Sequence, residues 1–255
     1  MNSIRNSVRV AIVTGEFFNS HETMINRHIM HLFGGNTCVI CKTLTDEARP
    51  DKPFLNWRGV RETSLDRIVN VPRKFFHRQM YGTRNVPRGN QRRQLIRFLE
   101  EQKVEVILGE FATQTVTFAP IAHEIGIPIV GYFRGADVTR DLHKKVSAYR
   151  KMLPILDGVI SVAQYLLDHL AVNGIVHPES YVIPSGVDIR RFTPGEKING
   201  RCVAVGRMVE KKAPLLTLKA FCDVAEHNKH ITLEMLGGGP LLEDCRRYAQ
   251  KRGLN

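Results

Sequence analysis

The loop Gly206–Lys212 holds residues whose types and spacing suit the binding of an anion. Arg207 offers a planar guanidinium with paired N–H donors, and Lys212 offers a compact positive charge. A pyrophosphate is bound well by such a fork together with an ammonium group. Cations beside a turn are usually only solvated, so this loop alone does not establish a site.

A run of glycines forms a second candidate loop, and Pro240 follows it. The glycines are Gly237, Gly238 and Gly239. Glycine lets a backbone approach a ligand closely, and proline suits the first position of a helix, whose free N–H groups attract an anion. A glycine-rich turn is usually just a turn. Two such loops after neighbouring parallel strands meet at one edge of the sheet, however, and together they predict a phosphate site.

The elements that must position these loops follow from the hydrophobic pattern. Short β-branched runs alternate with amphipathic stretches, which is typical of a parallel sheet covered by helices on both faces. The predicted strands are Val8–Thr14, Thr37–Cys41, Val104–Leu108, Ile127–Phe133, Gly158–Val162 and Tyr181–Ile183. The predicted helices are Glu22–Phe33, Gln91–Gln102, Thr115–Ile125, Arg140–Leu153 and Ala163–Val172. Residues 43–90 are poorly periodic, and we expect long loops with short pieces of structure there.

A second βαβα run follows a segment punctuated by proline and glycine. Its strands are Arg201–Val205 and Ile231–Leu236, and its helices are Ala213–His227 and Leu241–Arg252. Two strands and two helices cannot cover both faces of a parallel sheet. We therefore expect an N-terminal Rossmann-like domain over residues 1–183, a hinge over 184–199 and a second domain over 200–255 that is either incomplete or completed by something else.

The charge balance is strongly basic, with a formal net charge of +12 over 255 residues. No acid occurs from Arg67 to Leu99, and the stretch Arg73–Arg97 mixes cations with aromatic residues. Such a surface suits an anionic membrane face or a polyanionic acceptor, and the alternative is a solvated basic face. No nucleic-acid-binding motif accompanies the charge, so we expect no nucleic-acid partner. No signal peptide or membrane span is predicted, which favours a cytoplasmic location.

Cysteine and histidine residues suggest metal or redox chemistry only weakly. Cys38 and Cys41 have C-x-x-C spacing, but on a strand they point to opposite faces. We expect reduced thiols. His28 and His31 share a helix face without a clear third ligand, so we expect no metal site.

Five segments resemble glycosyltransferase family 4, in the order found in that family. Val182–Pro194 resembles its "IPNGVD…F.P" hinge, Ala204–Lys212 its "VGRL…KKG" loop and Leu236–Pro240 its "LGDGP" loop. Phe17–Ile25 is similar to "FP..SETFI", and Tyr132–Val138 is similar to "FHGYD(V/I)". These last two patterns belong to members that build exported polysaccharides and lipid-linked sugars.

The resemblance implies an α/β fold of the GT-B type and a retaining hexosyl transfer without a metal or cofactor. The donor would be a UDP- or GDP-sugar, and the acceptor a glycan or lipid-linked sugar at the cytoplasmic membrane face. Arg207 and Lys212 would hold the donor diphosphate and stabilise the leaving charge. The donor-binding glycines would be Gly206, Gly237, Gly238 and Gly239. The residues facing the sugar and acceptor would be Gly15, Glu22, Arg134 and Asp137.

Several of these positions have structural alternatives. Asn19 and Glu22 have the spacing of a helix capping box. Asp137 can cap the helix that follows it, and Asp188 can stabilise the hinge turn.

The chain also departs from the family pattern at single positions. Arg134 stands where His is frequent, Gly238 where Asp is common, Ala213 where Gly is common and Ala163 where Ser is usual. The family's paired glutamates would lie beyond residue 255. Glu226 and Glu234 have that spacing by coincidence.

Two other classes of function compete with a sugar transferase. A truncated remnant or one half of a split gene would bind an anionic glycan or partner without catalysis, and a missing C-terminal half motivates that alternative. A nucleotide-binding oxidoreductase would need a dinucleotide fingerprint, and no G-x-G-x-x-G occurs in the chain.

Overall fold

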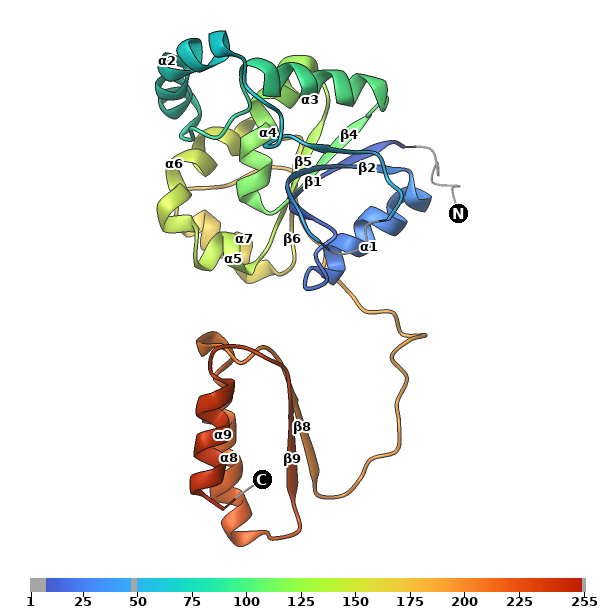
Figure 1. Cartoon of the computed structure of the whole chain (residues 1–255), viewed down its shortest axis with the longest axis vertical. Coiled ribbons are helices and arrows are strands. Elements are labelled where there is room, and N and C mark those ends of the chain that lie inside the picture. The colour runs from blue at the N-terminus through green and yellow to red at the C-terminus, as the bar shows by residue number, and fades with distance from the viewer. Residues whose placement is uncertain (1–7, 47–49, 254–255) are drawn as a thin grey trace. The chain divides into compact units, whose positions relative to one another are not determined.

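The computed structural model describes residues 8–46 and 50–253, and its contacts divide the chain into two units (Figure 1). The first unit ends at Gly186, and the second begins at Val187. Each unit has its own sheet and its own buried core.

The first unit contains a parallel sheet of seven strands in the order β3-β2-β1-β4-β5-β6-β7. The strands are β1 Val10–Phe17, β2 Thr37–Leu44, β3 Phe54–Asn56, β4 Val106–Glu110, β5 Ile129–Phe133, β6 Gly158–Ser161 and β7 Ser180–Val182. From β1 the chain moves outward to β3 and then returns to the other side of β1 with β4, so the order reverses between β1 and β4. Sheets of this kind bind ligands beyond the carboxyl ends of the strands at such a reversal.

Helices cover both faces of this sheet (Figure 1). They are α1 Thr23–His31, α2 Ser64–Tyr81, α3 Gly89–Glu101, α4 Ala112–Ile125, α5 Gly135–Thr139, α6 Leu142–Met152 and α7 Gln164–Val172. On one face, Ile25 and Ile29 of α1 pack on residues such as Ile12. On the other face, α3, α4, α6 and α7 contribute to the larger buried cluster. The alternating pattern that predicted a covered parallel sheet is confirmed.

The two cysteines with C-x-x-C spacing confirm the alternation of side chains along β2. Cys38 belongs to the larger buried cluster and Cys41 to the smaller one, so they lie on opposite faces of the sheet. Neither cysteine forms a disulfide with the described residues, and burial raises the pKa of Cys38 to about 11. The spacing therefore has a packing role and creates no redox pair.

The expectation of long loops with short pieces of structure over residues 43–90 is wrong about the long helix of this region. This region contains β3 and the 18-residue helix α2. Thr63 and Asp66 form a reciprocal capping box at the start of α2, and Gly82 ends it with a φ of 68°. Exposed apolar side chains such as Phe75 and Phe76 blur the expected periodicity, whereas the two caps were readable in the sequence.

The second unit is small and has a sheet of two parallel strands. Its elements are β8 Arg201–Val205, the 3-10 turn η3 Glu210–Lys212, α8 Pro214–His227, β9 Thr232–Leu236 and α9 Leu242–Lys251. Both helices lie on one side of the sheet (Figure 1), and Leu218 of α8 and Cys245 of α9 form its buried core. Val203 and Val205 are 54% and 79% exposed. These two valines of β8 are therefore not covered by the described part of the chain.

Candidate functional site

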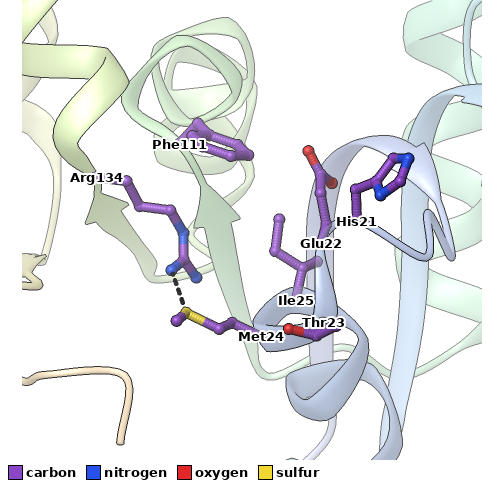
Figure 2. Close-up of a pocket in the computed structure, with 7 residues that line it drawn as sticks. All are labelled: His21, Glu22, Thr23, Met24, Ile25, Phe111 and Arg134. Carbon is purple, nitrogen blue, oxygen red and sulfur yellow. Dashed lines mark hydrogen bonds between the residues drawn. The ribbon is translucent and has the colours of Figure 1, made fainter. Parts of the chain in front are cut away.

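A pocket of about 190 Å³ lies where β1, β4 and β5 end, beside the reversal in strand order. Its lining residues are His21, Glu22, Thr23, Met24, Ile25, Phe111 and Arg134. Figure 2 shows the Glu22 carboxylate and the Arg134 guanidinium on opposite sides of this pocket. The fold therefore brings together two of the residues that the sequence placed on the sugar and acceptor side.

A buried ion pair fixes the guanidinium of Arg134. Its Nη2 donates to Glu110 Oε2 over 2.6 Å, and the Glu110 side chain is completely buried. His28 Nδ1 contacts the other carboxylate oxygen of Glu110. Both groups also contact the Tyr132 ring, because the Arg134 guanidinium carbon is 4.5 Å from its centroid and the His28 ring stacks on it at 5.6 Å. A buried ion pair offsets the cost of removing its charges from water only when its geometry is good. Here the ionic and aromatic contacts together hold the Arg134 guanidinium in place.

Arg134 keeps donor capacity for a ligand. Its Nε is buried and has no hydrogen-bond partner among the described residues. Its Nη1 has only long contacts of 3.5 Å, to Met24 Sδ and Ser185 Oγ. A guanidinium carries five N–H donors, so a hydroxyl or phosphate oxygen in the pocket can be bound.

Glu22 provides a hydrogen-bond acceptor on the other side of the pocket. Its Oε2 is buried without a hydrogen-bond partner among the described residues. Burial, and then the nearby Glu16 carboxylate, raises the pKa of Glu22, while Arg134 opposes the shift. The predicted capping box with Asn19 does not form. Instead, α1 begins at Thr23 without a side-chain cap, and Asn19 Oδ1 accepts from the N–H of His21.

Asp137 and Gly15 lie near the site but do not line this pocket. Asp137 is 1% exposed and accepts from the backbone N–H groups of Arg134 and Ala112. Burial raises its pKa to about 6, although these backbone hydrogen bonds oppose the shift. It joins the starts of α5 and α4. Gly15 belongs to β1, which continues to Phe17.

Sequence reasoning missed two residues at the end of β4. Glu110 is the buried partner of Arg134, and Phe111 lines the pocket with a φ of 71°. A non-glycine residue at positive φ is strained, and such residues gather at functional sites. A glutamate two residues after the apolar run that ends at Leu108 was the available signal, because a charge at the end of a buried strand needs a partner.

The second unit places Arg207 and Lys212 in one pocket of about 240 Å³ at the end of β8. Gly206 and Pro214 line it as well. Lys212 ends the 3-10 turn, and Ala213 then adopts φ 47° and ψ 49° before α8 begins. The two cations that the sequence paired therefore face one hollow.

The glycine-rich loop contacts the Arg207 loop directly. The N–H of Met208 donates to the carbonyl of Gly238 over 2.8 Å. A Cβ at Gly237 would lie 1.9 Å from the carbonyl oxygen of Gly206, and one at Gly239 would lie 2.6 Å from that of Met208. Gly237 and Gly239 are thus required by this close approach of two backbones.

The other two glycines assigned to the donor have open surroundings. A Cβ at Gly206 or Gly238 would meet no atom within 4 Å. The space beside these residues is the part of the two loops that a ligand can approach.

The remaining candidate residues have structural roles. Asp188 Oδ1 accepts from the N–H of Arg190, which confirms the hinge-turn role. Glu226 forms an ion pair with Arg252 and Glu234 forms one with Arg201, so neither carboxylate is left unpaired to bind a nucleotide-sugar donor. Within the described ranges, no group of three metal-ligating side chains occurs. No helix of the described residues is long and apolar enough to cross a bilayer.

Comparisons with known proteins relate the chain to sugar-nucleotide enzymes. A sequence profile described as Glycosyltransferase Family 4 matches residues 35–191, which is more than half of the chain. No curated protein sequence matches this chain. Among solved structures, HepE from Anabaena in complex with UDP-glucose has a TM-score of 0.65 and 12% identity, covering 97% of this chain and 67% of its own.

Two further solved structures share the fold. A glycosyltransferase from Rickettsia africae has a TM-score of 0.58 and 12% identity, with 97% of this chain and 66% of its own covered. The UDP-GlcNAc 2-epimerase from Methanocaldococcus jannaschii has a TM-score of 0.52 and 13% identity, with 97% and 69% covered. The chain thus spans about two thirds of their length. At such identities these similarities show the fold, which is of the predicted GT-B type, and the epimerase has it too.

Proposed function

The chain belongs to glycosyltransferase family 4, and from this premise we propose that it transfers a hexose from a nucleotide-diphosphate donor to a glycan or lipid-linked acceptor. The transfer retains the anomeric configuration and serves the assembly of cell-surface polysaccharide. The observation that carries the proposal is the pairing of Arg207 with Lys212 in one pocket beside the glycine-rich loop.

Arg207 and Lys212 have the chemistry that the departure of a nucleoside diphosphate needs. As the bond between the sugar and the diphosphate breaks, negative charge grows on the leaving oxygen. A guanidinium fork and an ammonium group stabilise that charge without a metal ion. The open space beside Gly206 and Gly238 is accessible to the same ligand.

We assign the pocket of the first unit to the sugar hydroxyls. The Arg134 guanidinium offers unused donors, and Glu22 offers an unused acceptor oxygen. A polyol presents both donors and acceptors, so it fits a pocket that presents the complementary groups. We place Glu110 as a positioning residue, because it holds Arg134 rather than touching the ligand.

The membrane-facing part of the proposal is supported by α2. Phe75, Phe76 and Met80 are 67%, 55% and 51% exposed on this basic helix. Exposed aromatic side chains among cations suit the surface of an anionic membrane, where a lipid-linked acceptor would be met. We therefore propose action at the cytoplasmic face of a membrane.

Calorimetric titration of the 255-residue chain with UDP and with GDP tests the donor assignment. We expect saturable binding of one nucleotide, and Arg207→Ala or Lys212→Ala should weaken it about tenfold or more, because each removes a charge-assisted contact. The matched control is Lys211→Ala, since Lys211 does not line the pocket.

Equal affinity of the wild type and Arg207→Ala would remove the diphosphate assignment. A folded chain that binds neither nucleotide would favour the rival function, a non-catalytic protein that binds an anionic glycan or partner. The exposed apolar side chains of Val203 and Val205 support this alternative function, since a partner can cover them.

A further inference from the structure

A second pocket of the first unit, of about 430 Å³, shares no lining residue with the Glu22–Arg134 pocket. It lies between the segment after β3, helix α2 and the connection from α2 to α3. Four cations and one carboxylate line it: Arg58, Lys74, Arg84, Arg88 and Glu62. We call it the cationic pocket. A single carboxylate cannot neutralise four cations, so the pocket attracts an anion.

The Trp57 side chain lines the cationic pocket and carries an unused donor. Trp57 is 3% exposed and packs edge-on against Phe118, with ring centroids 5.6 Å apart. The Arg58 guanidinium carbon lies 4.5 Å from the centroid of its ring. The indole Nε1 is buried and has no hydrogen-bond partner among the described residues. An indole N–H is only a donor, and leaving it buried and unpaired is costly.

Arg88 is the second buried group with an unused donor. It is 8% exposed, and its Nη1 donates to the carbonyl of Arg84 over 2.6 Å. Its Nε is buried without a hydrogen-bond partner in the described part of the chain. Burial is the largest cause that lowers the pKa of Arg88, Glu62 opposes the shift, and Arg58 adds to it. Burial and the neighbouring Arg58 destabilise the charged form of Arg88, and a bound anion would stabilise it.

We propose that the cationic pocket binds a phosphate or pyrophosphate group. Trp57 and Arg88 line the pocket and each has a buried, unpaired N–H that a small shift of the side chain can turn to the anion, while the exposed side chains of Lys74 and Arg84 close on the anion from solvent. A phosphate has three or more acceptor oxygens, so it can use donors from several directions, whereas a carboxylate has two. The site is separate from the donor loops of the second unit, and it does not depend on the sugar-transfer reaction.

The phosphate can come from solution or from a lipid headgroup. Helix α2 carries Lys74 directly before the exposed Phe75 and Phe76. An anionic membrane would therefore present its phosphates to the same residues. A soluble phosphate would bind without a membrane, whereas a lipid phosphate would bind only as part of a bilayer. The experiment therefore measures binding of a phosphate in solution and binding of vesicles separately.

Binding of inorganic pyrophosphate is measured by calorimetry on the full chain carrying Arg207→Ala and Lys212→Ala, which removes the proposed diphosphate site of the second unit. Binding to vesicles of phosphatidylcholine with phosphatidylglycerol is measured by sedimentation in the same background. The test variants are Lys74→Gln with Arg84→Gln, both at exposed side chains, and Trp57→Phe, which keeps an aromatic side chain and removes the indole N–H. Arg97→Gln is the matched control, because Arg97 is an exposed cation of α3 outside the pocket. Thermal melting of each variant checks that it is folded.

We expect saturable pyrophosphate or vesicle binding that falls about tenfold or more in the double variant and severalfold in Trp57→Phe. Arg97→Gln should change it less than twofold, as expected for one distant charge. Pyrophosphate binding with this pattern supports a soluble phosphate, and vesicle binding alone with this pattern supports a lipid phosphate. Absence of binding in both arms would overturn the proposal, and so would equal losses in Arg97→Gln and the double variant.

Discussion

Ala213 has a backbone conformation that disfavours its own side chain. Its φ of 47° and ψ of 49° lie in the left-handed region, and its side chain is exposed. It stands between Lys212, which lines the donor pocket, and Pro214, which begins α8. In this region the Cβ of an L-residue costs roughly 1–2 kcal/mol relative to glycine. Relatives that carry glycine here avoid this cost.

Replacing Ala213 with glycine should therefore stabilise the second unit. Relief of the backbone strain is partly offset by the greater freedom of glycine in the unfolded chain, which is worth about 0.4–1 kcal/mol. No buried contact of the methyl group is lost, because the residue is exposed. We expect a net gain of about 0.5–1 kcal/mol in the free energy of unfolding of this unit.

The control is the same change at Ala220, an exposed position inside α8. There, glycine lowers stability by about 1 kcal/mol, because the helical backbone is already unstrained. The only tryptophan, Trp57, lies in the first unit, so its fluorescence does not report on the second. Hydrogen exchange of the α8 amides does, since protection measures the free energy of local opening.

We expect protection of α8 to rise severalfold in Ala213→Gly and to fall about fivefold in Ala220→Gly. A loss of protection in both variants would refute the left-handed conformation at Ala213. It would also refute the view that this departure from the family pattern is a strained position next to Lys212.

Three further perturbations test the two sites. Glu22→Gln should flatten the pH dependence of acceptor binding, which in the wild type weakens as pH falls through the raised pKa of Glu22, and a pH series of acceptor affinity measures this. Gly237→Ala should disrupt the packing of the two loops, because its Cβ would lie 1.9 Å from a carbonyl oxygen, and calorimetry should then detect no nucleotide binding. Gly238→Ala should keep the fold of the loops, because its Cβ would enter open space. Glu110→Gln should lower the free energy of unfolding by about 3 kcal/mol, because it breaks a buried ion pair. The control Glu124→Gln, at an exposed ion pair, should lower it by under about 1 kcal/mol. Urea unfolding followed by tryptophan fluorescence measures both values, and similar losses would contradict the assigned burial.

Local sequence signals predicted most of the elements. The alternation of apolar runs and amphipathic stretches gave the parallel sheet, because period two and period 3.6 are properties of the chain itself. The same reasoning failed for α2, whose exposed aromatic residues hide its periodicity. It failed also at Asn19, where the predicted capping box is replaced by a turn around His21.

The sites were predictable only in part. The pairing of Arg207 with Lys212 followed from one loop, whose short length keeps both cations near the end of β8. The partner of Arg134 did not follow, since Glu110 is distant in sequence and reaches it only through the pairing of β4 with β5. The unused donors of Trp57 and Arg88 were equally hidden, because burial of a side chain is a property of the packed molecule.

The sequence by itself thus determined the alternation of strands and helices, the family and the loops that carry charge. The tertiary structure decided which charges meet, which glycines are needed by a neighbouring backbone and which polar atoms lose their water. Gly237 and Gly239 show the difference, because their spacing suggested a ligand and their surroundings are the carbonyl groups of another loop. Periodicity and motifs are local, whereas contacts between the ends of parallel strands depend on strand order, and strand order exists only in the folded chain.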